Sequence, residues 1–415
     1  MLRSAAGRAT AIAFIASGIL TGTLASRWPW LAGRLHLTSG VIGALGLAST
    51  AGALATMPFS ARFVHRYGAR AATCVLTVAI GVTLALPPFA PNIAVLAVIF
   101  VLMGAALGTQ DNAMNTAGVE AESLTGTTIL SGLHGTWSVG VLAGALAGSV
   151  AAKAGLDPRI QFTATGALIA VGGLGCARWL PGDPVVGSTV VGSTVVGSTA
   201  VGSTVAGAAT ADPATVVDVP LFVWPRGVVL LIGLVAFAAI FVEFAASSWA
   251  ALFMHWTLHA SQAIAALATA VFALAMAAGR FAGDAAVARI GAVGSVRVCG
   301  VLGTAGCVLV AVAPAVWLAI AGFVLIGLGV SVVVPLVFAA AGHYGPSPAI
   351  GVAGVATVSY GAGLVAPGLM GGIADVSSLR FAFALAAVIA VAVAAGAGLL
   401  GRAAADQPAM AGTEG

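Results

Sequence analysis

Long apolar stretches recur along the whole chain, and they constrain its fold more than any other feature. Each is long enough to cross a bilayer as a helix, which takes about 20 mostly apolar residues. None shows the alternating polarity that marks the roughly 10-residue strands of outer-membrane barrels. The stretches therefore predict transmembrane α-helices.

The composition agrees with a membrane protein and excludes a soluble one. Only 7% of the 415 residues are charged, against about a quarter in an ordinary soluble domain. So few charges cannot cover a soluble globule of this size, but they suffice for the loops of a membrane protein. The net charge of +4 is spread along the chain, so we expect no nucleic-acid partner.

Charged residues, prolines and asparagines divide the chain into twelve predicted spans, which makes it an all-α membrane protein. They lie near 9–30, 39–63, 71–89, 93–116, 127–151, 159–180, 227–250, 261–283, 294–313, 316–339, 348–372 and 379–400. We expect an N-terminal six-helix bundle over 1–180, a linker over 181–225, and a C-terminal six-helix bundle with a short tail over 226–415.

The basic residues predict the orientation. Twelve spans put both termini on one side of the membrane, and eleven of the sixteen basic residues fall on that side. Four fall on the other side, and Arg27 lies within a span. Arg280, close to the end of its predicted span, is counted with the eleven. Because cytoplasmic loops are enriched in Lys and Arg, we expect a multi-pass protein of the cell (inner) membrane with both termini in the cytoplasm.

A five-residue repeat occupies the predicted linker. Val-Val-Gly-Ser-Thr begins at 185 and recurs from 190 and from 195, between Pro184 and Pro213. A period of five matches neither a helix nor a strand. We therefore interpret this segment as a flexible cytoplasmic linker rather than a thirteenth span.

The two halves of the chain repeat each other. A shift of 223 positions places Arg66-Tyr67-Gly68 on Arg289-Ile290-Gly291, and Trp137 on Tyr360. Such a repeat predicts two bundles related by an axis along the membrane normal.

At this point the chain resembles the major facilitator superfamily of transporters. Its segment from Ala61 to Arg70 is similar to that family's loop motif, Gly-x-x-x-Asp-Arg-x-Gly-Arg-Arg, with His65 in place of the Asp. The resemblance implies the twelve-helix fold of that family. It also implies a gating role for the loop, at His65, Arg66, Gly68 and Arg70.

A second, narrower resemblance lies in the fourth span. Asp111-Asn112-Ala113-Met114-Asn115 looks like the Glu-x-x-x-Asn element of fucose-permease-like proton-coupled sugar symporters. By that resemblance Asp111 takes the place of the coupling acid, and Asn115 that of a substrate-binding amide, with Asn112 beside it. The acid expected in the first span is absent, and Arg27 stands about where it would be.

Four ionisable residues stand well inside predicted spans, namely Arg27, Asp111, His134 and Glu243. A charge at the centre of a bilayer costs about 2.5 to 3.5 kcal/mol on insertion scales, so such residues usually face a cavity or a partner. A buried carboxyl group such as Glu243 can exchange a proton with either side, as coupling requires. The alternative is a structural pair with Arg27 across the bundles, and the two roles are compatible.

The remaining candidates would contact solute. Arg27 can hold an anionic group, His134 and the amides can orient a polar solute, and aromatic side chains can cover its apolar face. We predict a substrate-binding set made of Arg27, Asn112, Asn115, His134, Trp137, Trp249 and Tyr360. Packing within the bundle for His134, and anchoring at the membrane interface for the aromatic rings, are the alternatives.

These features favour a secondary transporter that moves a small, sugar-like or other polar solute by alternating access, coupled to protons. Proton-driven export of a drug-like molecule or secondary metabolite is the alternative. A Walker-type phosphate loop, a Gly-x-Ser-x-Gly nucleophile elbow and an H-E-x-x-H metal site are all absent from the sequence. We expect no enzymatic activity and no cofactor, and we expect a monomer. A transport-dead membrane sensor is a third possibility.

The predicted orientation can be tested by labelling within the repeat. Gly192→Cys should resist a membrane-impermeant maleimide in intact cells and react after permeabilisation. Gly155→Cys, in a loop predicted to lie outside, should react in both conditions and is the control. Labelling of position 192 in intact cells would overturn the orientation.

Overall fold

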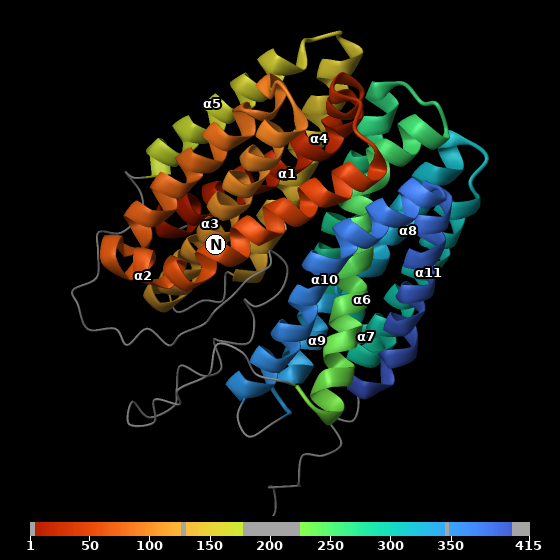
Figure 1. Ribbon diagram of the computed structural model, residues 1–415. Helices are drawn as coiled ribbons and strands as arrows, with labels where there is room; N and C mark the ends of the chain where they lie inside the picture. The colour runs from red at the N-terminus through yellow and green to blue at the C-terminus, as the bar shows by residue number, and fades with distance from the viewer. Residues whose placement is uncertain (1–4, 126–129, 177–224, 345–347, 401–415) are drawn as a thin grey trace, which may run out of the picture.

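A computed structural model of the chain describes residues 5–125, 130–176, 225–344 and 348–400. Over these residues the chain is helical, without a β-strand. The helices form two groups that lie side by side (Figure 1), and the chain crosses from one group to the other once, between α5 and α6. The linker repeat falls outside the described residues.

The N-terminal group comprises α1 (Ala5–Leu35), α2 (Ser39–Ala85), the short 3-10 turn η1 (Pro87–Phe89), α3 (Ile93–Thr125), α4 (Leu130–Lys153) and α5 (Pro158–Cys176). The C-terminal group comprises α6 (Gly227–Leu252), the π-helical turn η3 (Phe253–Thr257), α7 (Gln262–Val312), α8 (Val316–Val330), α9 (Val333–Ala341), α10 (Pro348–Val376) and α11 (Leu379–Gly396).

Two of these helices each contain two predicted spans joined at a bent glycine. In α2 the bend is at Gly68, with φ 76° and ψ 153°. In α7 it is at Gly291, with φ 71° and ψ 171°. A positive φ is accessible to glycine and costly for other residues. The two glycines are equivalent under the 223-residue shift, so the structure repeats the bend that the sequence repeats.

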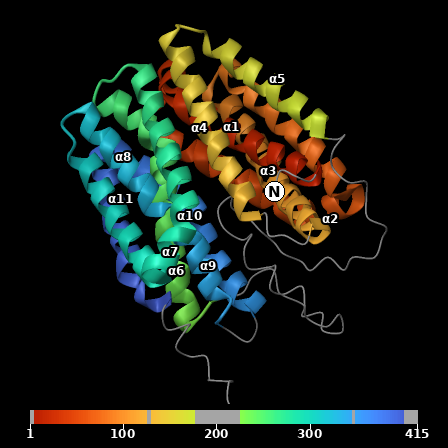
Figure 2. The same ribbon diagram turned by 180° about the vertical axis from the view of Figure 1, so that it is seen from behind.

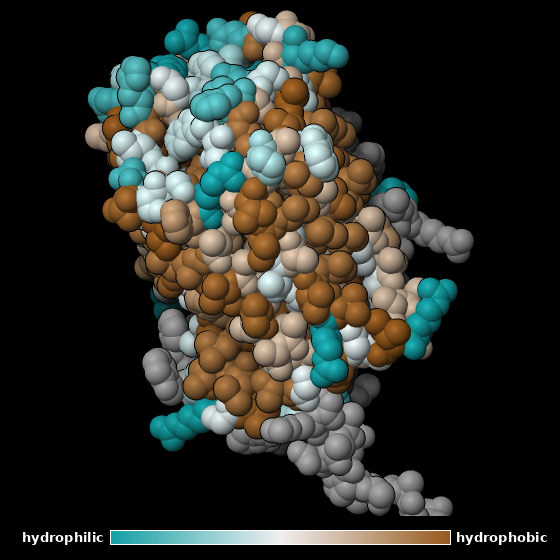
Figure 3. All heavy atoms as spheres, turned by 90° about the vertical axis from the view of Figure 1, so that its right-hand side faces the viewer, coloured by the Kyte–Doolittle hydropathy of each residue, from teal (hydrophilic) through white to brown (hydrophobic). Residues whose placement is uncertain are grey.

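The twelve-span expectation is confirmed. Among the described residues, eleven helical segments are long and apolar enough to cross a membrane, and α5, with 19 residues, corresponds to the remaining predicted span. Figure 3 shows apolar side chains over the middle of the molecule, with hydrophilic residues gathered toward its ends. Exposed leucines and valines such as Leu168, Val171 and Val388 are therefore placed to face lipid.

Glycines allow close packing within each bundle. A side chain at Gly140 or Gly144 of α4 would collide with the backbone carbonyl of Ile15 or Ile19 on α1. The same holds for Gly104 of α3 against α2. In a bilayer, helices associate by such contacts between small residues, because lipid supplies no hydrophobic drive toward association.

The two bundles meet most closely at one end of the molecule, which we call the short-loop end. It holds the connections at residues 36–38, 154–157, 258–261 and 377–378. There α2 packs on α10, and the hydroxyl of Ser149 on α4 donates to the carbonyl of Ala263 on α7 at 2.8 Å. Toward the opposite end, where the described chain stops at 176 and resumes at 225, the bundles splay apart (Figures 1 and 2).

The contact of α2 with α10 supplies a test with a matched control. A Cβ atom at Gly371 would lie 2.6 Å from the Ser39 carbonyl oxygen and 2.8 Å from the Cα of Gly43, whereas a Cβ at Gly372 would meet nothing within 4 Å. Gly371→Val should therefore separate the bundles at the short-loop end, and Gly372→Val should not. The measurement is labelling of a cysteine at Ser39, which is buried in this contact, and labelling should become faster only in Gly371→Val. Equal labelling in both variants would refute this packing.

Candidate functional site

A cavity of about 380 Å³ lies between the two bundles. Its lining comes from α1, α2, α3 and α4 of the first bundle and from α6, α9 and α10 of the second. Most of the lining is apolar, and it includes the aromatic residues Trp28, Phe100, Trp137, Phe244, Trp249 and Phe338. A chamber shared by two bundles can be opened to either side of the membrane if the bundles move relative to each other.

The polar part of the lining consists of hydroxyl groups and two carboxyl groups. The hydroxyls belong to Ser17, Thr21, Ser49, Thr50, Ser247, Ser248 and Ser359. The carboxyls belong to Asp111, which is 7% exposed, and Glu243, which is 6% exposed. Both predicted coupling acids therefore line one cavity, one from each bundle, together with the predicted Trp137 and Trp249.

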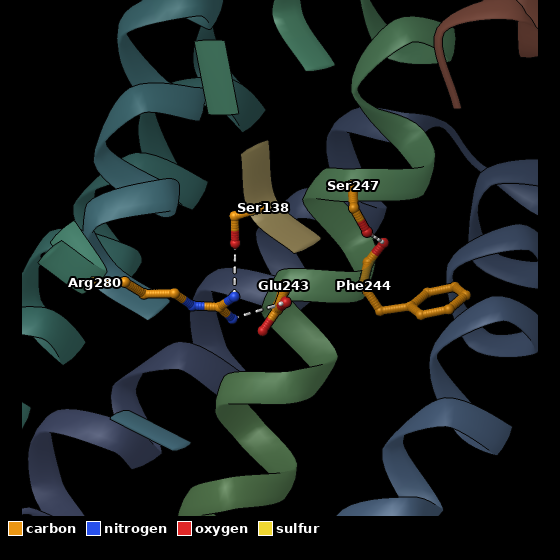
Figure 4. Close-up of polar contacts among 5 residues, drawn as sticks. All are labelled: Ser138, Glu243, Phe244, Ser247 and Arg280. Carbon is orange, nitrogen blue, oxygen red and sulfur yellow. Dashed lines mark hydrogen bonds and ion pairs between the residues drawn. The ribbon is translucent and has the colours of Figure 1, made fainter. Parts of the chain in front are cut away.

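Glu243 on α6 faces a buried arginine on α7. The Arg280 atom Nη2 lies 3.6 Å from the Glu243 atom Oε1. The other terminal nitrogen, Nη1, donates to the hydroxyl of Ser138 on α4 at 2.7 Å. Figure 4 shows the guanidinium between the two partners. Because Ser138 belongs to the N-terminal bundle, Arg280 connects the carboxylate to the opposite bundle.

This arrangement corrects two expectations. Arg280 lies within α7 and not in a loop, and its side chain is only 11% exposed. Arg280, rather than Arg27, is the ion-pair partner of Glu243. The positive charge of Arg280 favours the ionised carboxylate, whereas burial favours the neutral acid. Opposed influences of this kind suit a group that must exist in both states.

Arg27 lies elsewhere. Its side chain is 2% exposed, and its Nε donates to the Oε1 atom of Gln161 on α5 at 2.6 Å. It lines a second pocket, at the short-loop end, and not the central cavity. In this arrangement Arg27 joins α1 to α5, and it does not reach a solute in the cavity.

The two amides of the fourth span are also engaged within the protein. The Nδ2 atom of Asn115 donates to the backbone carbonyl of Asp111 at 2.8 Å, and that of Asn112 donates to the hydroxyl of Ser60 on α2 at 2.8 Å. Neither residue lines the cavity. Their position favours support of α3 around Asp111 over direct contact with solute.

His134 packs within the first bundle. Its ring meets that of Phe14 on α1 edge-on, with centroids 5.0 Å apart, and it does not line the cavity. Trp137, nearly one turn further along α4, does line it. The alternative reading of His134 as a packing residue thus fits the geometry better.

The predicted gating loop lies at the bend of α2, away from the cavity. Gly68 forms the bend itself. Arg66 is exposed, and its guanidinium lies over the ring of Tyr67 at 5.8 Å, while Arg70 is partly exposed. The side chains of His65 and Tyr360 lie outside what the structure describes.

The structure adds residues that sequence reasoning missed. Arg280 and Ser138 form the connection between bundles, and Trp28 lines the cavity with its ring 5.4 Å from that of Phe100. The sequence could have indicated Arg280, because a charged residue inside an apolar stretch is unusual. It could not have indicated the hydroxyl groups of the lining, since serine and threonine are common in membrane helices.

Comparisons with known proteins agree with this architecture. The chain is 31% identical over 386 residues to an uncharacterised MFS-type transporter of Yersinia pestis, with 92% of both chains covered. It is 30% identical over 378 residues to the uncharacterised transporter y4wD of Sinorhizobium fredii, covering 91% of this chain and 93% of that one. The membrane protein MosC of Rhizobium meliloti is 27% identical over 372 residues, covering 89% and 84%. No family model matches the chain.

Solved structures show the same fold at low sequence identity. The nucleoside transporter NupG superimposes with a TM-score of 0.69 at 14% identity, covering 96% of this chain and 98% of that one. A bacterial homologue of the human lysosomal transporter Spinster, in an inward-facing and unoccupied conformation, gives 0.68 at 14% identity, covering 98% of each chain.

The position of Arg27 can be tested through its partner. Gln161→Leu removes the acceptor of a buried guanidinium, which should lower the free energy of unfolding by about 1 to 3 kcal/mol. Gln262→Leu is the control, because it removes an amide that lines the same pocket but is not bonded to Arg27. Thermal unfolding in detergent measures both. Equal stability of the two variants would show that the bond contributes little.

Proposed function

This chain belongs to the major facilitator superfamily of transporters, and we propose that it is a secondary transporter that couples a small solute to protons through Glu243. It is a multi-pass membrane transporter and not an enzyme. The observation that carries the coupling proposal is the chain of contacts from Glu243 through Arg280 to Ser138.

The coupling step follows from the charges of these three groups. While Glu243 is ionised, it holds Arg280 between the carboxylate and the Ser138 hydroxyl. A proton on Glu243 removes the opposite charge from a buried guanidinium, which must then find other acceptors. The contact between the bundles therefore differs in energy between the two protonation states. A ligand shifts a conformational equilibrium only through such a difference, and here the ligand is the proton.

Asp111 supplies a second carboxyl on the opposite wall of the same cavity. The proposal assigns it to the same cycle, either to bind solute or to share protons with Glu243. Sequence resemblance supports the second role, because Asp111 stands where the fucose-permease-like branch has its acid.

The proposed orientation places the termini and the linker in the cytoplasm of a cell with the protein in its inner membrane. The short-loop end then faces outward, and its tight contacts close the cavity on that side. The bundles splay toward the cytoplasm, so the structure corresponds to an inward-facing arrangement. We propose that the bends at Gly68 and Gly291 lie at the cytoplasmic ends of the spans, where the loop motif can act on bundle movement, and that one chain is sufficient for transport.

Coupling is tested with Glu243→Gln, which mimics the protonated carboxyl. A thermal-shift screen of sugars, nucleosides, amino acids and amines first supplies a compound that binds. In proteoliposomes a pH gradient should drive accumulation of that compound by the wild type. In Glu243→Gln the compound should only equilibrate across the membrane, because the amide of glutamine cannot bind and release the coupling proton.

The control for that experiment is Asp157→Asn, which removes an exposed carboxylate from the loop before α5. It should accumulate the compound as the wild type does. Accumulation by Glu243→Gln with the wild-type dependence on pH would make Glu243 a structural partner of Arg280 and would refute the proposed coupling.

A further inference from the structure

We infer that the solute is a small organic cation, in which an ammonium group is attached to an apolar or aromatic body. The inference rests on the proposed function, because it identifies what the same cavity carries. It is drawn from the charges, the hydrogen-bonding groups and the rings of the lining, and it replaces the sugar-like solute expected from sequence.

The charge of the lining is the first observation. The described residues that line the cavity include two acids, Asp111 and Glu243, and no lysine, arginine or histidine. Arg280 is paired with Glu243 and is not part of the lining, so an anionic solute would enter an apolar chamber whose lining offers two acids and no basic side chain. A buried charge in that situation is strongly disfavoured.

The second observation is an acceptor that the protein leaves without a donor. The Oε2 atom of Glu243 is buried and has no hydrogen-bond partner among the described residues, while Oε1 faces Arg280. A buried carboxylate oxygen in this state lacks stabilisation that a donor would supply. An ammonium group offers up to three donors together with the opposite charge.

The hydroxyl groups of the lining also act as acceptors. Thr21, Thr50 and Ser359 already donate to backbone carbonyls of their own helices, at 3.1, 3.1 and 3.0 Å. Their oxygen lone pairs remain to receive donors from a solute. The described lining contains no asparagine or glutamine side chain, whose amide would offer a sugar a donor and an acceptor together.

The aromatic lining completes the match. Trp28 and Trp137 from one bundle and Trp249 from the other all contribute to the cavity. The face of an indole ring attracts a cation and also covers an apolar body. The remainder of the lining is mostly aliphatic, which suits a solute with little polar surface beyond its charged group.

Shared use of Glu243 sets the direction of coupling. One carboxylate can bind a proton or an ammonium group, and not both, so the two compete. Such competition produces exchange of one proton for one monovalent cation, which favours the proton-driven exporter over the symporter.

Arg280 of α7 is the charged group that pairs with Glu243, and Asp111 of α3 is the other acid of the cavity. Other charged or titratable groups on helices packed against α6 neither line the cavity nor pair with Glu243, as far as their side chains are described. They are Arg8, Arg27 and Arg34 on α1, His255 on η3, Arg289, Arg297, Cys299 and Cys307 on α7, Asp375 on α10, and Arg380 on α11. The pH dependence of cation binding should therefore follow the ionisation of Glu243, with Asp111 as the neighbouring acid.

Matched compounds test the inference by direct binding to the purified full-length protein in detergent. One series is phenethylamine, 2-phenylethanol and 3-phenylpropionate, and a second is tryptamine, tryptophol and indole-3-propionate. Within a series the body is nearly constant and the end group is cationic, neutral or anionic. The amines should bind at least about tenfold more tightly than the alcohols, and the carboxylates should not bind. Amine affinity should fall as the pH is lowered, because protonation removes the charge of Glu243.

Glu243→Gln is the matched variant, and it should abolish the preference for each amine over its alcohol. Residual binding of the alcohol also reports whether the variant is folded. Binding of the carboxylates as tightly as the amines, or no binding by either amine, would overturn the cationic solute.

The transport experiment separates this inference from the proposed function. If Glu243→Gln loses pH-driven accumulation and the wild type prefers carboxylates, proton coupling through Glu243 is supported and the cationic solute is refuted. If the wild type prefers amines and Glu243→Gln still accumulates solute, the cationic solute is supported and the coupling is refuted.

Discussion

The buried pair of Glu243 and Arg280 is the interaction on which the rest of this account depends. Charges in the hydrocarbon region are retained only where partners compensate their lost hydration. Here the compensation is divided between bundles, because Arg280 binds a carboxylate of its own bundle and a hydroxyl of the other. A change of charge at Glu243 therefore changes the energy of a contact between bundles, and chemistry in the cavity is connected to the shape of the whole molecule.

Packing inside each bundle makes that connection effective. Glycines bring α4 onto α1 and α3 onto α2 so closely that a methyl group would not fit. Bundles held in this way move as bodies, since interiors packed to this density shift between discrete arrangements and do not deform gradually. The contacts between bundles are fewer. At the short-loop end Gly371 of α10 meets α2, and α4 and α7 pack along each other from Ser149 and Ala263 to Ser138 and Arg280. A small change in one polar contact can then shift the balance between two arrangements.

The sequence predicted the fold well and the site in part. Span length and the internal repeat were sufficient for twelve helices, and even the bends at Gly68 and Gly291 fall on repeat-related positions. The cost of burying charge identified Glu243 as a residue of interest. The sequence does not show which helices face each other, and for that reason Arg27 was considered as the partner of Glu243. In the structure Arg27 donates to Gln161, 134 positions away. Arg280 was assigned to the membrane surface because a residue near the end of a predicted span can lie on either side of that boundary.

The most direct test is the distance between the bundles as a function of pH. Spin labels at Ile160 on α5 and Val376 on α10, which are 58% and 87% exposed, report the separation at the short-loop end. The account predicts that the wild type shifts between two separations as the pH changes. Glu243→Gln should keep, at every pH, the distribution that the wild type reaches at acidic pH. The same pH response in both proteins would contradict the coupling of Glu243 to the arrangement of the bundles.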